Sequence, residues 1–206
     1  MSLDLRSVPV TTSPVRRLSQ LLAGLALYGV SMGLMIRSTL GLDPWDVLHE
    51  ALSEWSGLSF GTVTAITGAL VLLCWIPLRE RPGIGTVANI VVIAVAVDLT
   101  LAVLAPPSAL APRIALMVGG VVLNGLATAA YIGVRLGPGP RDGLMTGLHR
   151  RKGWSIRVVR TAIELTVLAT GWLLGGTAGI GTIVYALAIG PVTQAFLPLV
   201  RWRTKE

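Results

Sequence analysis

Six apolar stretches of the chain are each long enough to cross a lipid bilayer as a helix, which takes about 20 residues. Short loops join them and leave little polar sequence for a water-soluble domain. We therefore expect an all-α polytopic membrane protein with the lipid bilayer as its partner. The stretches cover roughly residues 18–36, 60–78, 86–104, 113–134, 158–175 and 180–200.

The composition excludes several other classes of protein. Only 13% of the residues are charged, against about 25% in soluble domains. The net charge is +7, but the sequence offers no soluble surface on which basic and aromatic residues alternate. We therefore expect no nucleic-acid partner. Cys74 is the single cysteine, which excludes an internal disulfide and a thiolate metal site. We interpret His49 and His149 as solvated interfacial side chains, and we expect no metal and no cofactor.

The positive charges predict the orientation. If the N-terminus lies inside, 14 Lys and Arg residues fall on the inner side, among them Arg141 in an inner loop, and only Arg37 and Arg113 fall outside. The positive-inside rule then places both termini in the cytoplasm of a bacterial plasma (inner) membrane. Residues 1–17 do not resemble a cleavable signal peptide. We expect them to form a cytoplasmic segment, and residues 201–206 a basic cytoplasmic tail.

A 96-residue repeat divides the chain in two. Leu40–Leu48 returns in degraded form as Leu136–Leu144, and the Gly-Ile-Gly-Thr motif at 83–86 returns at 179–182. Each half, 18–105 and 113–200, has three predicted membrane crossings. Because this number is odd, the second half enters the membrane in the opposite orientation to the first. We therefore predict a 3+3 inverted-topology repeat. Such repeats exchange inward-open and outward-open states in transporters; a duplication kept only for packing is the alternative.

The first repeated motif predicts a short helix in each half. Asp43 is placed to cap it, Pro44 to begin it and Gly57 to end it. The helices could lie at the membrane surface, anchored by tryptophan, or be half-helices that point into a solute pathway. The candidate gating residues are Asp43, Pro44, Trp45, Asp46, Pro140 and Asp142.

The second repeated motif begins the last helix of each half. Its glycines suit a tight turn and its threonine can cap the helix; a backbone-lined site for an anion or polar group is the alternative. The residues concerned are Gly83, Gly85, Thr86, Gly179, Gly181 and Thr182.

Polar residues at membrane depth are further candidates. Asp98 lies inside the third apolar stretch, where a carboxylate is costly and by default functional. Its repeat partner is Gln194, so the two are predicted to approach each other across the pseudo-two-fold axis. Asp98 would bind a cation, relay a proton or hold a substrate amine; a structural hydrogen bond or ion pair is the alternative. Arg160 and Glu164 lie one turn apart and should neutralise each other. Asn89, Tyr28, Asn124 and Tyr185 are weaker pathway candidates.

Small residues predict one close helix contact. Gly29 and Gly33 match Gly125 and Ala129 in the repeat, and this spacing lets helices approach closely. We interpret it as a contact between the first and fourth apolar helices. No Ser/His/Asp arrangement, zinc-ligand spacing or carboxylate dyad is present in the sequence, so we do not expect an enzyme.

Three motifs of the first half resemble a known family. They are Leu-Gly-x-x-Pro-Trp-Asp at 40–46, Ser-Gly-Leu-Ser-Phe-Gly-Thr at 56–62 and Pro-Leu-Arg-Glu-Arg-Pro-Gly-Ile-Gly-Thr at 77–86, with Asp98 beyond them. The chain is similar here to the YczE/YitT-type bacterial integral membrane proteins, and to the YczE branch, since it carries no soluble regulatory domain. The resemblance implies a multi-pass plasma-membrane protein of a kind often described as a transporter, with no established substrate.

Two functions follow as hypotheses. The first is transport or export of a small solute of unknown identity, by alternating access between the two repeats. The second is a non-transporting membrane protein that assists assembly or regulation of a partner system. A homo-oligomer is compatible with either one.

Overall fold

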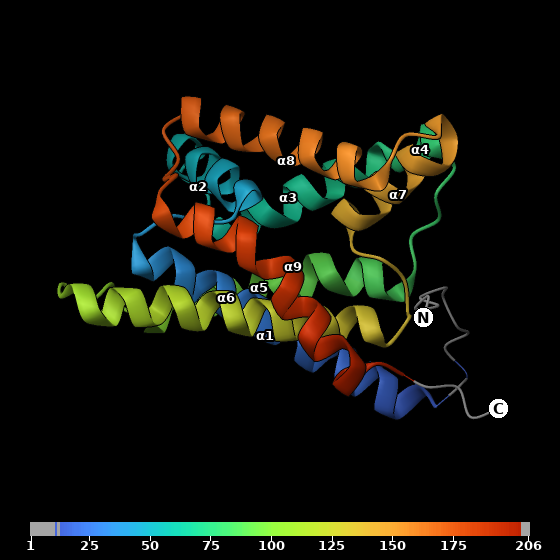
Figure 1. Cartoon of the computed structure of the whole chain (residues 1–206), viewed down its shortest axis with the longest axis horizontal. Coiled ribbons are helices and arrows are strands. Elements are labelled where there is room, and N and C mark those ends of the chain that lie inside the picture. Colours follow the sequence, from blue (N-terminus) through green and yellow to red (C-terminus); the bar gives the residue numbers. More distant parts are fainter. Residues whose placement is uncertain (1–10, 12, 203–206) are drawn as a thin grey trace.

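The computed structural model describes residue 11 and residues 13–202, and every regular element in that part of the chain is a helix (Figure 1). The helices are α1 (Pro14–Ser38), α2 (Pro44–Ser56), α3 (Phe60–Leu73), α4 (Trp75–Leu78), α5 (Ile84–Val103), α6 (Leu110–Gly133), α7 (Pro140–Lys152), α8 (Ile156–Leu173) and α9 (Ile180–Val200). Most of the predicted N-terminal segment (residues 1–10 and 12) and of the predicted tail (residues 203–206) lies outside the described residues.

Five helical stretches are long and apolar enough to cross a membrane: α1, residues 60–78, α5, α6 and α9. They match five of the six predicted crossings. The remaining one, near residues 158–175, is helix α8, which carries Arg157, Arg160 and Glu164 within its 18 residues and is not among the five. The sixth crossing therefore stays a prediction.

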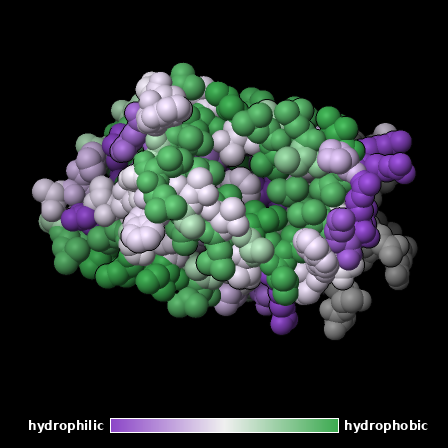
Figure 2. All heavy atoms as spheres, turned by 90° about the horizontal axis from the view of Figure 1, so that it is seen from above, coloured by the Kyte–Doolittle hydropathy of each residue, from purple (hydrophilic) through white to green (hydrophobic). Residues whose placement is uncertain are grey.

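The surface of the spanning helices is apolar, as contact with lipid requires. On α5, exposed apolar side chains recur every four residues, at Val91, Val95, Leu99 and Val103. This spacing keeps them on one face of the helix. Figure 2 shows that apolar residues cover much of the molecule, while hydrophilic ones gather mainly towards its ends.

The helices form two layers (Figure 1). In the first, which we call the base layer, α1 packs on α5 and α6, and α6 packs on α9. The second, the upper layer, contains α2, α3, α4, α7 and α8, with α2 packed on α8 and α7 on α3, α4 and α8. The main junction between the layers is the contact of α3 with α5.

The contacts of glycine residues show in which directions the base-layer helices run. Gly29 of α1 lies against Ile93 of α5, and Gly33 lies against Thr100 further along, so α1 and α5 run parallel. In the same way Gly125 of α6 lies against Val192 of α9, and these two helices are also parallel, because Gly133 contacts the following Arg201.

The prediction for the small-residue motif was therefore wrong. Gly29 and Gly125 pack the first and last helices of each half together, because only a residue without Cβ admits the neighbouring backbone so closely. The contact between α1 and α6 uses other glycines. Gly24 lies against Ala130, and Gly120 lies against Met35, so α1 and α6 run antiparallel.

Two arginines bind the helices of opposite halves in the same way. Arg17 Nε donates to the carbonyl oxygen of Val134 at 3.0 Å, and Arg113 Nε donates to that of Ser38 at 2.9 Å. Each guanidinium satisfies carbonyl groups that a helix end leaves without partners. Arg17 and Arg113 are 96 residues apart, so the repeat offset recurs in the contacts.

The Gly-Ile-Gly-Thr motifs also join opposite halves. Gly85 N donates to the carbonyl oxygen of Leu136 at 3.0 Å, and Gly181 N donates to that of Leu40 at 2.7 Å. The segments that accept these bonds turn at Gly41 and Gly137, both with φ of +121°, which favours glycine. These two amides of the motifs are therefore bonded to protein carbonyls.

The short helices α2 and α7 each have 13 residues, a proline in the first turn and a glycine cap at the end. Their first turns meet inside the protein, where the guanidinium of Arg141 lies 3.8 Å from the carboxylates of Asp43 and Asp46. The far end of α2 is exposed, with 87% of Trp55 accessible. Figure 1 shows α2 and α7 at opposite ends of the upper layer. They are half-helices that start in the middle of the bundle.

The antiparallel arrangement predicts that the far ends of α2 and α7 face opposite sides of the membrane. In a Cys74→Ser background, we expect the cysteine of Glu54→Cys to react with an impermeant maleimide added to intact cells. The cysteine of Arg151→Cys should react only after the membrane is permeabilised. Labelling of both positions from the same side would contradict this arrangement.

Candidate functional site

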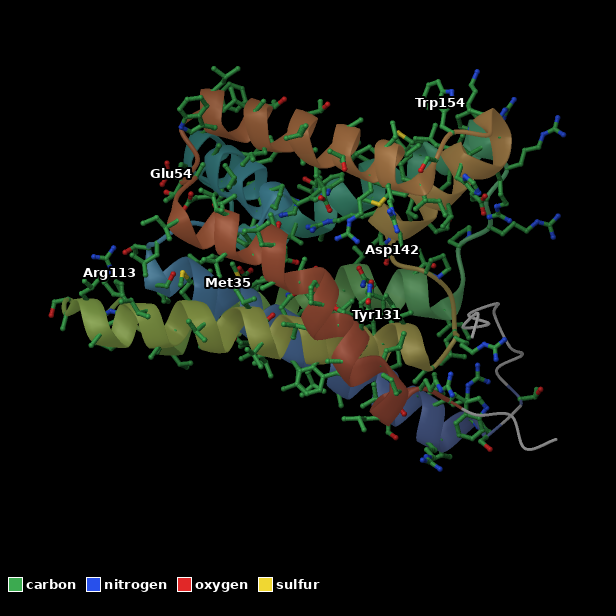
Figure 3. All side chains as sticks on the ribbon, viewed as in Figure 1. Met35, Glu54, Arg113, Tyr131, Asp142 and Trp154 are labelled. Carbon is green, nitrogen blue, oxygen red and sulfur yellow. The ribbon has the colours of Figure 1, made fainter. Side chains whose placement is uncertain are left out.

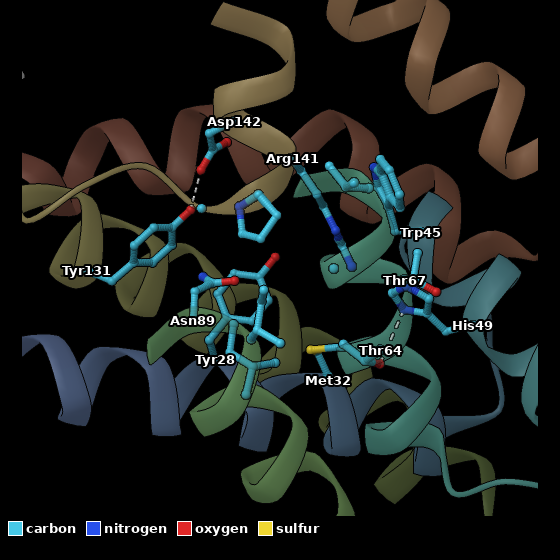
Figure 4. A pocket seen from close by; sticks show the side chains of 16 residues that line it. Tyr28, Met32, Trp45, His49, Thr64, Thr67, Asn89, Tyr131, Arg141 and Asp142 are labelled. Carbon is cyan, nitrogen blue, oxygen red and sulfur yellow. Dashed lines mark hydrogen bonds between the residues drawn. The ribbon is translucent and has the colours of Figure 1, made fainter. Parts of the chain in front are cut away.

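A cavity lies between the two layers and has two lobes. The α3 lobe, of about 80 Å³, is bounded by α1, α2, α3, α5, α6 and α7. The α8 lobe, of about 230 Å³, extends between α8 and α9. Five residues line both lobes and so lie between them: Tyr28, Trp45, Tyr131, Arg141 and Asp142 (Figure 4).

The two lobes are built from equivalent positions of the two halves. Residues of the α3 lobe have partners 96 positions later that line the α8 lobe. The pairs are Met32 with Thr128, His49 with Met145, Thr64 with Arg160, Gly68 with Glu164, Asn89 with Tyr185, and Ile93 with Ile189. At these matching positions the α3 lobe has neutral side chains, whereas the α8 lobe has the charged pair Arg160 and Glu164.

Arg141 and Trp45 occupy the boundary between the lobes and are themselves repeat partners. The guanidinium carbon lies 4.7 Å from the centre of the indole ring, a cation–π contact. The nearest carboxylates, of Asp43 and Asp46, are 3.8 Å away, too far for direct hydrogen bonds. The Arg141 side chain keeps 24% of its surface accessible, on the cavity.

The first turn of α2 is closed by its own side chains. Asp43 Oδ1 accepts a hydrogen bond from the Asp46 amide at 2.8 Å, which confirms the predicted N-cap. Asp46 Oδ1 lies 3.1 Å from His49 Nδ1, and the Thr64 hydroxyl approaches the same ring nitrogen at 3.4 Å. His49 is 1% exposed, so its interpretation as a solvated interfacial residue was wrong.

Burial also shifts the pKa values of the ionisable side chains in this turn. Because water is excluded, the pKa of Asp43 rises to about 6 and that of Asp46 to about 7, although Arg141 opposes both shifts. Burial lowers the pKa of His49 to about 3, so the imidazole is neutral and its contact with Asp46 is a hydrogen bond rather than an ion pair. All three residues lie outside the five candidate spanning stretches.

Hydroxyl and amide groups complete the polar lining. Tyr131 donates to Asp142 Oδ2 at 2.5 Å, and the labelled pair is visible in Figure 3. Tyr28 packs edge-on to Tyr131 with ring centres 6.1 Å apart. On the α8 side, the Tyr185 hydroxyl donates to Asn124 Oδ1 at 3.1 Å. These bonds hold the aromatic rings at fixed positions in the cavity wall.

Asp98 lies elsewhere. Its carboxylate accepts hydrogen bonds from the Ser59 hydroxyl at 2.6 Å and from the Gly61 amide at 2.7 Å. It therefore caps the start of α3 and ties it to α5, and it lines neither lobe. This is the structural hydrogen bond that the sequence left open as the alternative.

Gln194 lies at the opposite end of the base layer. It lines the α8 lobe near the C-terminus of α9, a helix end that Gln20 of α1 contacts through the Val200 carbonyl. Asp98 lies near the other end of α1, since Gly33 faces the neighbouring Thr100. The structure therefore does not bring Asp98 and Gln194 together.

The remaining predicted residues divide into two groups. Asp43, Pro44, Trp45, Pro140, Asp142 and Asn89 line the cavity, whereas the Gly-Ile-Gly-Thr residues line neither lobe. Arg160 Nε donates to Glu164 Oε1 at 2.8 Å, which confirms their predicted pairing, and both line the α8 lobe.

Sequence reasoning missed the central cation. Arg141 was counted with the positive charges of a cytoplasmic loop, but it lies between the layers, because α7 starts inside the bundle and not at the surface. A signal was present: Arg141 is the repeat partner of Trp45 and directly precedes Asp142. Tyr131 was missed because its repeat partner, Met35, carries no polar group.

The comparisons with known proteins assign the family. The model of a family of unknown function, DUF6198, matches residues 15–198. The chain belongs to this family. A Haemophilus influenzae "Uncharacterized protein" is 41% identical over 92% of this chain and 87% of its own length. The Bacillus subtilis "Uncharacterized membrane protein YczE" is 36% identical over 85% of this chain and 83% of its own.

A third relative is more distant. The Bacillus subtilis "Uncharacterized protein YyaS" is 26% identical over 86% of this chain and 90% of its own length. No solved structure matches. The expected resemblance to YczE is confirmed, and with the five apolar helices it makes the chain a multi-pass membrane protein.

The buried charges predict a pH-dependent effect of Arg141. In Arg141→Gln, Asp43 and Asp46 lose their counter-charge, so ionising them in the fold costs more. We expect a loss of about 2 kcal/mol in unfolding free energy near pH 8, where both are ionised, and little loss near pH 5, where both are protonated. Thermal unfolding of the purified protein at the two pH values measures this.

The control for this effect keeps the arginine deletion and removes the carboxylates. Adding Asp43→Asn and Asp46→Asn to Arg141→Gln should abolish the difference between the two pH values. An equal destabilisation by Arg141→Gln at both pH values would show that the carboxylates do not sense the guanidinium.

Proposed function

We propose that this protein is a small-solute transporter of the bacterial inner membrane that works by alternating access between two inverted repeats. One observation carries the proposal. Two equivalent junctions between the layers are in different states: α3 is fixed to α5, whereas α8 is separated from α9 by the larger lobe.

The directions of the helices support inverted repeats. In the base layer, α1 and α5 of the first half are parallel, α6 and α9 of the second half are parallel, and the two pairs oppose each other. The reciprocal arginine and Gly-Ile-Gly-Thr contacts obey the same 96-residue offset. Two halves related in this way can exchange conformations, which gives two states of similar energy with opposite openings.

The closed junction is a latch made by Asp98. Its hydrogen bonds from Ser59 and Gly61 hold the start of α3 so close to α5 that a Cβ at Gly61 would clash with the Ala94 carbonyl oxygen. This contact holds together α3 and α5, two of the helices that line the α3 lobe, which is the smaller of the two lobes.

The equivalent junction of the second half is open. Gln194 takes the place of Asp98, and the counterparts of Ser59 and Gly61 are Ser155 and Arg157, both exposed. Gln194 makes no hydrogen bond to either one within the described part of the chain. Instead α8 packs on α2, where Gly171 lies against the backbone of Leu48.

These contacts suggest a rocking motion of the upper layer over the base layer. Movement towards α9 would close the α8 lobe and bring Ser155 to Gln194, while it separates α3 from α5 and opens the α3 lobe. Arg141 and Trp45 lie at the pivot and would face the solute in both states. With the termini in the cytoplasm, the Asp98 latch lies on the outer side, so the described state is open inwards.

The latch can be tested without knowing the solute. In a Cys74→Ser background, Thr67→Cys places a reporter thiol in the α3 lobe, and Thr193→Cys places one in the α8 lobe. We expect Asp98→Ala to make the α3-lobe thiol react several-fold faster with an impermeant maleimide from the outer side. The α8-lobe thiol should react more slowly from the cytoplasmic side. Removing the latch shifts the two-state equilibrium by the free energy that the latch contributes.

Gln194→Ala is the matched comparison, because Gln194 would meet Ser155 only in the opposite state; it should therefore not raise the reactivity of the α3-lobe thiol from the outer side. If Asp98→Ala changes neither rate, the two junctions do not exchange. The protein is then better described as a non-transporting membrane partner.

A further inference from the structure

We propose that the cavity binds a small organic cation, whose ammonium group is held by the carboxylate of Asp142 and the ring of Tyr28. The inference rests on the proposed function, since this cavity is the one assigned to transport. It adds the chemical class of the solute and the side chains that recognise it.

The charges of the α8 lobe favour a cation. Three carboxylates line it, those of Asp43, Asp142 and Glu164, against the two guanidinium groups of Arg141 and Arg160. Arg160 and Glu164 pair with each other. The ionised lobe therefore has an excess of negative charge, and a buried charge is costly unless an opposite charge or a proton balances it.

Arg141 is already shared between two buried carboxylates. Its guanidinium lies 3.8 Å from Asp43 and 3.8 Å from Asp46. Asp43 is only 3% exposed, and its Oδ2 atom, unlike Oδ1, accepts no hydrogen bond within the described residues. Burial and the nearby Asp46 raise the pKa of Asp43 to about 6, as expected of an acid with too little positive charge around it. Arg141 therefore has no charge to spare for a third acid.

Asp142 lacks the cation that its repeat partner has. The offset of 96 residues relates Asp142 to Asp46, and Trp45 to Arg141. Asp46 faces the guanidinium of Arg141, but the position equivalent to that arginine carries the indole of Trp45. Asp142 accepts a hydrogen bond from Tyr131, and no cationic group lies within ion-pairing distance of it in the described part of the chain. A cationic solute would supply the missing charge.

Aromatic rings independently point to the same class of solute. All three tyrosines of the chain, Tyr28, Tyr131 and Tyr185, line the α8 lobe together with Trp45. The face of an aromatic ring attracts a cation, and ammonium ligands are recognised in this way. The guanidinium of Arg141, 4.7 Å from the centre of the Trp45 ring, already shows such a contact in this cavity.

The proposed binding groups lie where both lobes meet. Tyr28 and Asp142 each line both lobes (Figure 4). Tyr28 packs edge-on to Tyr131, whose hydroxyl donates to Asp142, so the ring and the carboxylate belong to one cluster. A cation held there would be reached from either lobe, as alternating access requires. The α8 lobe, of about 230 Å³, restricts the solute to a small one.

Binding to the purified full-length protein in lipid nanodiscs at pH 8 tests the inference, with empty nanodiscs as background. The probes are two ammonium compounds and neutral alcohols of nearly the same shape: choline with 3,3-dimethylbutan-1-ol, and ethanolamine with 1-propanol. We expect at least one cation to bind roughly tenfold more tightly than its alcohol in calorimetric titration, because only the cation gains from the carboxylate. The anion 3-hydroxypropionate should bind no better than the alcohols.

Variants identify the site. Asp142→Asn keeps an acceptor for Tyr131 but removes the charge, and should weaken cation binding by roughly tenfold. Tyr28→Leu removes the ring and should weaken it several-fold. Tyr28→Phe keeps the ring and should bind as the parent does, because the Tyr28 hydroxyl forms no hydrogen bond within the described residues. Glu54→Gln, which removes an exposed acid that lines neither lobe, should also bind as the parent does.

The inference is overturned if neither cation binds more tightly than its alcohol, since protons alone then balance the carboxylates. Unchanged binding in folded Asp142→Asn or Tyr28→Leu also overturns it. If Asp142→Asn does not fold, Asp43→Asn replaces it, because asparagine still caps α2 while the lobe loses a negative charge; several-fold weaker binding is expected, and unchanged binding counts against the site.

The failure of this inference is distinguishable from failure of the proposed function. If the cations do not bind while the reporter thiols of Thr67→Cys and Thr193→Cys respond to Asp98→Ala as expected, the transport proposal stands and only the solute class falls.

Discussion

The fold depends on how two extended segments inside an apolar bundle satisfy their backbone groups. Residues 39–43 and 134–139 leave helices and enter the bundle, where lipid offers no hydrogen bonds. Each segment finds a partner in the opposite half: Leu40 accepts from Gly181, and Leu136 accepts from Gly85. Neither half can close its entering segment alone, so the two halves must fold as one unit. The half-helices α2 and α7 can start in the interior only because these bonds exist.

The site follows from that geometry. Two helix N-termini that meet in the interior create two places where negative charge is favourable. Asp43 occupies one of these places, and at the other the carboxylate of Asp142 lies close to Gly139. The result is one polar centre with two unlike sides, and Trp45 and Arg141 lie at the boundary between them.

The sequence predicted what depends on periodicity and local chemistry: the apolar helices, the Asp43 cap, the helices after Pro44 and Pro140, and the pairing of Arg160 with Glu164. The sequence-based predictions were wrong for side chains whose role depends on how deeply they lie inside the protein. Arg141 and His49 follow loops, so a reader of the sequence places them at a surface, yet both lie where α2 and α7 begin inside the protein. The helix that packs against Gly29 was missed, because residue spacing shows that one face of a helix carries small residues but does not show which helix packs on that face. Asp98 looked like a pathway residue because its bond partners, Ser59 and Gly61, are distant in sequence.

The difference between Asp98 and Gln194 has a thermodynamic consequence. In a carrier whose halves were identical, the inward-facing and outward-facing forms would be equally populated without solute. If the protein is the carrier proposed above, a carboxylate latch on one side and an amide on the other would make the two forms unequal in free energy, so the carrier without solute would open mainly to one side. This preference cannot fix the direction of net flux, which the solute gradient decides. It sets instead the concentration range, on each side of the membrane, over which the carrier saturates.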